Sequence, residues 1–359
     1  MLLSRTLLKN ILLEIRSMQT ADFDFELPTE LIAQDPVVPR DTSRMLVLDR
    51  EKESILHKRF YDLPDFLCPG DVLVVNDTRV VPARLFGTIP EVGTGKVEVL
   101  LLNEVVGGFQ RVMAKPGKKF QPGRTVVFDD QLQAIVEGIE EDGCRLLRFN
   151  CLLAELQRHL ARIGHAPIPP YIKESNATRE QYQTIYAQDP GSSAAPTAGL
   201  HFTPKVFEGL AEKGVVVEKV TLHVGRGTFQ EVKVEDLENH VMHSEHFELS
   251  VGVADRLNRA KQEGRRIVAV GTTSVRVLES CSDEEGVLVP KLSDTNIFIY
   301  PGYEWRFVNA LLTNFHLPKS TLIMLVSSFA GREFVMRAYQ EAIQEKYRFF
   351  SFGDCMLIQ

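Results

Sequence analysis

The sequence changes its pattern between residues 97 and 149, and this change most limits the folds open to the chain. Short runs of strand-forming residues are separated there by turns rich in Gly and Asp, at 97–102, 109–113, 125–128, 133–136 and 144–149. Strands of this length and spacing, with no helix between them, predict a small β-barrel. A chain of 359 residues has room for about two domains, so we expect another domain beside it.

The rest of the chain alternates strands with helices. We expect strands at 73–75, 215–224 and 266–270, and helices at 152–163, 180–187, 205–213, 254–263, 271–280, 321–330 and 333–347. Such alternation predicts an α/β domain with a mostly parallel or mixed sheet. Several polar motifs follow directly after these strands, where ligands bind in sheets of this kind.

Composition and the first residues exclude several classes of protein. The net charge is −7, so a nucleic acid would have to meet a local basic face. Residues 1–17 form an amphipathic pattern without the features of a secretory signal; we expect an extension outside the fold, with a surface helix as the alternative. No apolar run reaches the roughly 20 residues of a membrane span. The five cysteines form no C-x-x-C pair, which predicts free thiols in a reducing cytoplasm: Cys68, Cys144, Cys151, Cys281 and Cys355.

The stretch 195–204, APTAGLHFTP, is the first candidate for a site. Its small residues leave backbone N–H groups open to a ligand, and His201 has a pKa usable near neutral pH. Thr203 and Pro204 then begin a helix. The ordinary alternative is a turn in which His201 is only a hydrogen-bonding partner.

Other polar segments suggest anion binding. The strongest is 271–276, where a strand, a tight turn and a helix start favour a carboxylate or phosphate. Arginines at 40–44, the polar cluster 76–79 and the basic turn 115–119 suit phosphate contacts, although each also fits a solvated turn. The segment 93–96, GTGK, is not a P-loop, because the earlier glycine is missing and a strand follows.

Three kinds of chemistry compete on these residues. A metal hydrolase would use His240, His243 and His246, but their spacing does not place all three on one face. A nucleic-acid-binding module would use the basic turns, but it fits poorly with the acidic net charge. A transferase with a small zwitterionic or nucleoside ligand agrees with the helix start at 271–276 and the small-residue loops.

The motifs taken together resemble one family. They are DFELP at 24–28, RDTSR at 40–44, NDTR at 76–79, APTAGLHFT at 195–203, HVGRGTF at 223–229, MHSE at 242–245, GTTSVR at 271–276 and TNFHLP at 313–318. In this order they resemble the S-adenosylmethionine:tRNA ribosyltransferase-isomerase family of queuosine biosynthesis. The resemblance runs from about residue 18 to 358.

The resemblance implies a reaction. The ribosyl group of S-adenosylmethionine is transferred to the aminomethyl group of a 7-deazaguanine (preQ1) at the tRNA wobble position, and is rearranged to an epoxycyclopentanediol. Adenine and methionine leave, and the tRNA carries epoxyqueuosine. The partners are then this tRNA and S-adenosylmethionine, with no metal, separate cofactor, membrane or obligate protein partner. We expect a cytoplasmic monomer.

The resemblance also implies domains and roles. A mixed-sheet α/β domain (18–65 and 153–359) would carry an inserted small β-barrel domain (66–152). We hypothesise that His201 and His243 act as acid or base, with Glu245 or Asp77 as orienter or second base. The substrate residues would be Thr197, Gly199, Gly227, Thr228, Thr272, Thr273, Arg276, Asn314 and His316, with Thr272, Thr273 and Arg276 on the methionine carboxylate. The tRNA contacts would be Arg44, Arg79, Lys115, Lys118 and Lys119.

Overall fold

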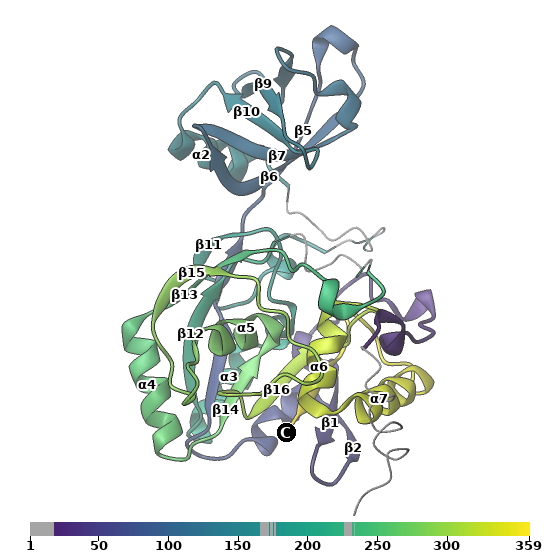
Figure 1. Ribbon diagram of the computed structural model, residues 1–359, viewed down its shortest axis with the longest axis vertical. Coiled ribbons are helices and arrows are strands. Elements are labelled where there is room, and N and C mark those ends of the chain that lie inside the picture. The colour runs from purple at the N-terminus through teal and green to yellow at the C-terminus, as the bar shows by residue number, and fades with distance from the viewer. Residues whose placement is uncertain (1–17, 166–171, 173–174, 176, 226–231, 233) are drawn as a thin grey trace, which may run out of the picture.

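The computed structural model describes residues 18–165, 172, 175, 177–225, 232 and 234–359. A large α/β part and a small β part lie one above the other along the longest axis (Figure 1). No helix in these ranges combines the length and the apolar character that crossing a membrane requires.

Within the described ranges, nine strands form one large mixed sheet. In spatial order they are β15 (Lys291–Thr295), β13 (Glu245–Leu249), β12 (Val216–Leu222), β3 (Val72–Asn76), β14 (Ile267–Val270), β16 (Ala310–Asn314), β17 (Cys355–Ile358), β1 (Arg44–Asp49) and β2 (Ser54–Arg59). The central strands β12, β3, β14 and β16 are parallel. Antiparallel pairs extend the sheet on both sides.

Both faces of this sheet are covered. In β3, Val72 and Val74 enter the core on one face, while Leu73 and Val75 enter the core on the other. Because successive side chains point to opposite faces, an unbroken apolar strand is one that helices cover on both sides. The first face carries α4 (Val251–Gln262), α5 (Gly271–Cys281), α6 (Thr321–Ala330) and α7 (Arg332–Gln344). The second carries α3 (Pro204–Glu212) and the 3-10 segments η4 (Phe60–Phe66) and η8 (Thr197–His201).

The small part is an antiparallel sheet that nearly closes on itself. Its strands, in spatial order, are β5 (Arg84–Gly87), β6 (Val97–Val106), β7 (Phe109–Lys115), β10 (Arg145–Phe149), β9 (Gln133–Ile139) and β8 (Thr125–Val127). Thr88 and Val127 exchange two backbone hydrogen bonds, of 2.8 and 2.9 Å, that link the two edges. This confirms the expected fold class of an α/β domain with a small barrel.

The structure moves the boundaries drawn from the sequence. β3 lies inside 66–152, yet it pairs with β12 and β14 of the large sheet. Conversely, α2 (Leu153–Ile163) packs Leu156 and Leu160 into the core of the small part. The small part with its own core therefore spans Ala83 to Ile163. Two short strands, β4 (Thr78–Val80) and β11 (Asp189–Ser192), pair beside the connection.

The helix expected at 180–187 does not form. The segment holds only a short 3-10 turn, η7 (Glu180–Tyr182), before β11. Tyr182 and Tyr186 bury their rings against neighbouring aromatic side chains instead. Packing of these rings outweighs the helical pattern of the local sequence.

Candidate active site

A pocket lies where the parallel strands β14 and β16 end. Parallel strands place their carboxyl ends at one edge of a sheet, so the segments that follow them meet there. The pocket is an open hollow of about 480 Å³, a volume that includes the solvent at its mouth. It is lined by Ala195, Pro196, Thr197, Ala198, Val224, Gly271, Thr272, Thr273, Thr313, Asn314, Phe315, His316, Leu322, Phe350 and Ser351.

The start of α5 forms one wall. Gly271 joins β14 to α5 with a φ of +83°, a conformation that favours glycine. Thr272 and Thr273 follow in the first turn, each 7% exposed. The Thr273 hydroxyl is buried and has no hydrogen-bond partner among the described residues. A helix N-terminus with an unused hydroxyl suits the binding of an anionic group.

His201 ends η8 and is held on both ring nitrogens. Asn314 donates its amide to the carbonyls of Phe350 and Ser351, so its oxygen accepts from the Nε2–H of His201 at 3.1 Å. His201 Nδ1 then accepts from the Ser43 hydroxyl at 2.7 Å. Burial lowers the pKa of His201 to about 4. This histidine is therefore neutral near pH 7, and its two nitrogens are engaged.

His316 lines the pocket, whereas His201 lines a separate small hollow beside Arg40 and Phe352. The Nε2 of His316 contacts the Thr313 hydroxyl at 3.0 Å, and its backbone N–H donates to the Tyr339 hydroxyl at 3.0 Å. Burial lowers the pKa of His316 to about 3. Both histidines near the pocket are thus neutral hydrogen-bonding groups in the free protein.

Glu245 and Arg276 pair with each other. Glu245 begins β13, and its carboxylate also accepts the Gly225 N–H at 2.7 Å. Arg276 lies in the second turn of α5 and donates to the Thr295 carbonyl at 3.2 Å. Both side chains are buried, which makes their mutual pairing essential. Glu245 and the Thr295 carbonyl thus engage both terminal nitrogens of the guanidinium that the sequence assigned to a substrate carboxylate, while its buried Nε has no partner among the described residues.

Asp77 lies one strand away, after β3. Its carboxylate accepts from the Thr221 hydroxyl at 2.8 Å. Burial raises its pKa, while the Thr221 hydrogen bond and the Lys219 charge oppose that rise. Next to it, the Thr78 hydroxyl contacts His223 Nδ1 at 2.7 Å. Asp77 is the buried carboxyl of this edge whose pKa moves towards neutral pH.

Other predicted site residues lie elsewhere. His243 is exposed in an irregular segment and does not line the pocket. Gly199 is buried, and a side chain there would collide with the Tyr186 hydroxyl, so its glycine serves packing and not ligand approach. Gly227 and Thr228 lie outside the described residues.

The residues expected to contact tRNA differ in accessibility. Arg44 stacks on Tyr347, with its guanidinium carbon 3.7 Å from the ring centre, and pairs with Glu345 at 3.8 Å. These contacts explain Arg44 as a structural residue. Arg79, Lys115 and Lys118 are exposed, whereas Lys119 donates to a backbone carbonyl of the barrel.

The sequence missed several residues around the pocket. Phe350 and Ser351 line it from the last loop, and Ser43 supports His201 from a distant segment. Ser43 and His201 are 158 positions apart, and Phe350 and Ser351 are 36 and 37 positions from Asn314, so no local motif signals these contacts. The small-residue and helix-start motifs were the signals that did locate the pocket.

The histidine trio of the metal hypothesis does not come together. His246 pairs with Asp294 at 2.9 Å, His240 packs on Phe298, and His243 faces solvent. Over the ranges the structure describes, these three do not form a potential metal cluster. The metal-hydrolase hypothesis therefore has no support in this geometry.

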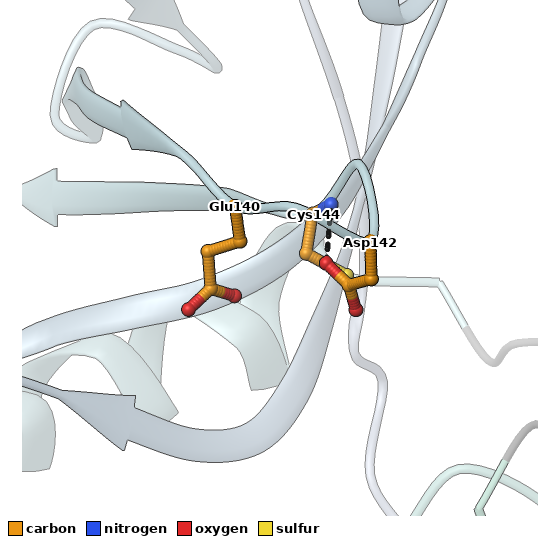
Figure 2. Close-up of side chains that lie close together, drawn as sticks. All are labelled: Glu140, Asp142 and Cys144. Carbon is orange, nitrogen blue, oxygen red and sulfur yellow. Dashed lines mark hydrogen bonds between the residues drawn. The ribbon is translucent and has the colours of Figure 1, made fainter.

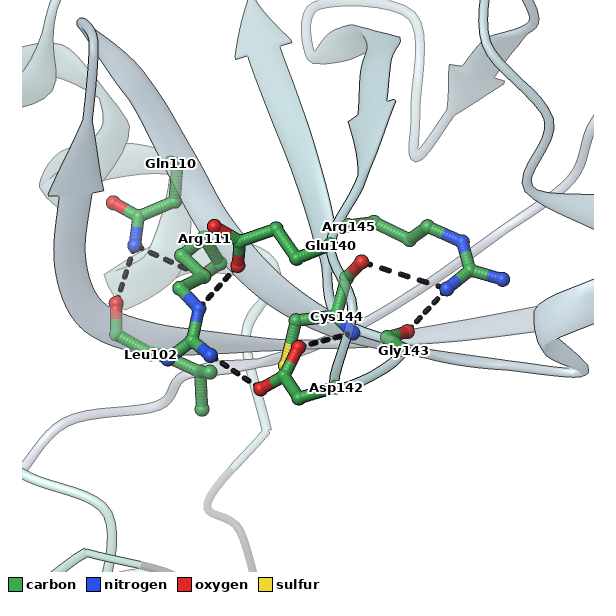
Figure 3. Close-up of polar contacts among 8 residues, drawn as sticks. All are labelled: Leu102, Gln110, Arg111, Glu140, Asp142, Gly143, Cys144 and Arg145. Carbon is green, nitrogen blue, oxygen red and sulfur yellow. Dashed lines mark hydrogen bonds and ion pairs between the residues drawn. The ribbon is translucent and has the colours of Figure 1, made fainter.

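A different acidic group lies on the barrel. Glu140, Asp142 and Cys144 gather at the turn between β9 and β10 (Figure 2). Figure 3 shows Arg111 pairing with both carboxylates, and the Cys144 N–H donates to Asp142 at 3.0 Å. Burial raises the pKa of Cys144 to about 11, which disfavours the thiolate a metal needs. The Arg111 guanidinium already bridges both carboxylates, so we interpret this cluster as an ion-pair network.

Known proteins match this chain along nearly its whole length. A family model described as queuosine biosynthesis protein matches residues 20–358. Proteins named S-adenosylmethionine:tRNA ribosyltransferase-isomerase from Acetivibrio thermocellus and Symbiobacterium thermophilum are each 52% identical and cover 95% of this chain, which spans 100% of each relative. A crystal structure of S-adenosylmethionine tRNA ribosyltransferase from Thermotoga maritima is 39% identical, with a TM-score of 0.53 over 94% of this chain and 100% of that one. The chain therefore belongs to the family of queuosine biosynthesis proteins.

Proposed function

We propose that this chain is an S-adenosylmethionine:tRNA ribosyltransferase-isomerase that acts on preQ1 at the tRNA wobble position. It transfers the ribosyl group to the aminomethyl nitrogen and rearranges it to the epoxycyclopentanediol of epoxyqueuosine. Adenine and methionine leave, and one proton is released because the sulfonium charge disappears. A cytoplasmic location, and activity without a separate cofactor or obligate protein partner, belong to the same proposal. Support comes from the family and from the pocket built by its motifs.

The observation that carries the proposal is the unused hydroxyl of Thr273 at the start of α5. The methionine part of the substrate ends in a carboxylate, and an open helix N-terminus offers backbone N–H donors and a favourable dipole. Thr273 adds a buried hydroxyl donor that has no hydrogen-bond partner among the described residues. We assign the carboxylate to Thr272, Thr273 and these backbone groups, with Arg276 held away by Glu245.

The reaction also needs proton transfer. A base removes a proton next to the sulfonium, and an acid protonates departing adenine. His201 and His316 are poorly matched to this work near pH 7, because burial keeps both neutral and weakly basic. Asp77, whose pKa is raised by burial, is better matched. We therefore assign proton transfer to Asp77 and positioning to His201, which fixes the Asn314 amide.

Adenine release tests this function. The protein is mixed with S-adenosylmethionine and tRNA carrying preQ1, and adenine and methionine are followed by chromatography. We expect release in equal amounts with the modified tRNA and none with tRNA that has guanine at the wobble position. Asp77→Asn should slow release at least ~100-fold, within the usual worth of an acid–base group, without changing S-adenosylmethionine affinity. Equal release from both tRNAs, or none from either, would contradict the proposal.

A further inference from the structure

Positive charges gather where the chain passes between the large part and the barrel. Arg84 begins β5, and His165 follows α2; their backbones exchange hydrogen bonds of 3.1 and 2.7 Å, so both connections lie side by side here. Phe86 packs edge-on against His165 with ring centres 5.1 Å apart. The ammonium of Lys96 lies 4.0 Å from the centre of the Phe86 ring. Phe86 thus holds a cation and an imidazole in place.

Arg179 completes this group, which we call the junction cluster: Arg84, Phe86, Lys96, His165 and Arg179. Its guanidinium donates to the Gly164 carbonyl, just after α2. The Arg84 backbone bonds, the shared contact with Phe86 and the Gly164 bond place Arg84, Lys96 and Arg179 around His165. Partial burial and these charges lower the pKa of His165.

The cluster carries an excess of accessible positive charge. Glu98 pairs with Arg84 at 3.2 Å and offsets that charge. Lys96 and Arg179 are exposed, and neither forms an ion pair within the part of the chain that the structure describes. On a protein with a net charge of −7, such a local excess is the kind of surface that a polyanion selects.

The junction cluster also lies close to the pocket. Val81 donates its N–H to the Ser192 carbonyl at 3.0 Å. From this bond the chain runs three residues to Arg84 in one direction and three residues to Ala195, at the pocket wall, in the other. An extended residue spans at most about 3.5 Å, so the cluster is within roughly 25 Å of the pocket. An RNA strand that places one base in the pocket has flanking phosphates within this reach.

We propose that the junction cluster binds a backbone phosphate of the tRNA, on the strand that flanks the nucleotide in the pocket. The inference rests on the proposed function for the identity of the polyanion. Lys96 and Arg179 supply the charge, and the exposed His165 ring adds a further donor. Phe86 holds Lys96 and His165 in place, which reduces the entropy lost on binding.

The basic turn at Lys118 is the competing location. Lys118 is exposed on the barrel, in the segment that the sequence predicted for tRNA contact. A binding experiment separates the two locations, because each can be changed without the other. Lys213 is the matched control: it is exposed at the end of α3, which leads into the opposite, amino-terminal end of β12.

The test measures the Kd of the full-length protein for unmodified tRNA at several salt concentrations, without S-adenosylmethionine. Lys96→Ala and Arg179→Ala should each raise Kd about 5-fold or more and reduce the salt slope by about 1, because each removes one phosphate contact. Lys213→Ala should leave both quantities unchanged. Thermal unfolding of each variant checks that it folds. If Arg179→Ala unfolds α2 by losing the hydrogen bond to Gly164, Lys96→Ala alone decides the question.

Wild-type affinity and slope in Lys96→Ala would overturn the proposal, and so would losses confined to Lys118→Ala. Adenine release by the wild-type protein is measured in parallel with preQ1-tRNA. If the wild-type protein releases no adenine, the proposed function fails whatever the binding result. If it releases adenine while the cluster variants keep kcat/KM for tRNA, only the junction cluster fails.

Discussion

His201 shows how one buried side chain organises this site. It joins Ser43 to Asn314 through both ring nitrogens and stacks on Phe60 with ring centres 5.1 Å apart. The hydrogen bond that Nδ1 accepts from Ser43 needs the neutral ring, and burial, which lowers the pKa of His201, enforces that state. We therefore expect His201 to act as a positioning residue: it fixes the side chain of Asn314, which lines the pocket, and its replacement should lower activity by releasing that side chain.

This interpretation predicts acid-sensitive stability. The pKa of His201 is near 6.5 in the unfolded chain and about 4 in the folded protein, so only the unfolded state binds a proton between these values. The free energy of unfolding should fall as the pH drops from 6.5 to 4, by about 3 kcal/mol from His201 alone. Chemical denaturation across this range measures the loss.

The matched variants are His201→Gln, which should lose the share of this pH dependence that His201 contributes and keep the share from His316, and His243→Gln, which should keep all of it because His243 is exposed. An unchanged pH dependence in His201→Gln would show that His201 is not buried in the neutral form.

At the scale of elements, the small-residue stretch 195–201 is explained by packing against the segment that follows η7. Gly199 of η8 lies directly against the Tyr186 hydroxyl, which is buried and has no partner among the described residues. Tyr186 in turn packs edge-on against Phe202 and Phe207. The glycine thus allows η8 to approach this aromatic group and brings Thr197 and Ala198 to the pocket.

Gly199→Ala should therefore destabilise the protein by about 1–3 kcal/mol, the usual range for overpacking. Tyr186→Phe removes the hydroxyl that collides, so the double variant should recover part of the loss. A double-mutant cycle of unfolding free energies measures this coupling. Strictly additive effects would mean that the two residues do not meet.

Elements with strong local signals were predictable. The limits of α6 agree with the apolar run 321–330 because Ser320 caps its first turn, and the strand–turn–helix at 266–280 was found from its pattern. The sequence did not predict which sheet a strand joins. β3 joins the large sheet through partners more than 140 residues away. The Glu245–Arg276 pair, 31 positions apart, was missed because each residue was given a separate role, Glu245 as orienter or second base and Arg276 on the substrate carboxylate.

At the scale of the whole molecule, the two parts have separate hydrophobic cores. Leu147 is fully buried in the core of the barrel, and Leu312 is fully buried in the sheet of the large part. Each core buries apolar surface without the other, so the parts should respond separately to a cavity.

Leu147→Ala and Leu312→Ala each create a cavity that should cost about 2–5 kcal/mol in its own part. Calorimetry should show two unfolding transitions. Leu147→Ala should lower the temperature of the barrel transition, and Leu312→Ala that of the large part. S-adenosylmethionine affinity should change only in Leu312→Ala, whose strand supports the pocket. A single transition lowered equally by both variants would contradict two separate cores.

The most direct test of the central claim follows ribose-labelled S-adenosylmethionine into tRNA. With preQ1-tRNA, the wild-type protein should place one label in the tRNA for each adenine and methionine released. Thr273→Val should need at least ~10-fold more S-adenosylmethionine to reach half of its maximal labelling rate, because it loses a hydrogen bond to a charged group. Ser274→Ala is the control. The Ser274 hydroxyl donates to the Val270 carbonyl, so its loss should leave the S-adenosylmethionine requirement unchanged. Adenine release without label in the tRNA would contradict ribosyl transfer, and unchanged S-adenosylmethionine dependence in Thr273→Val would contradict the pocket assigned to it.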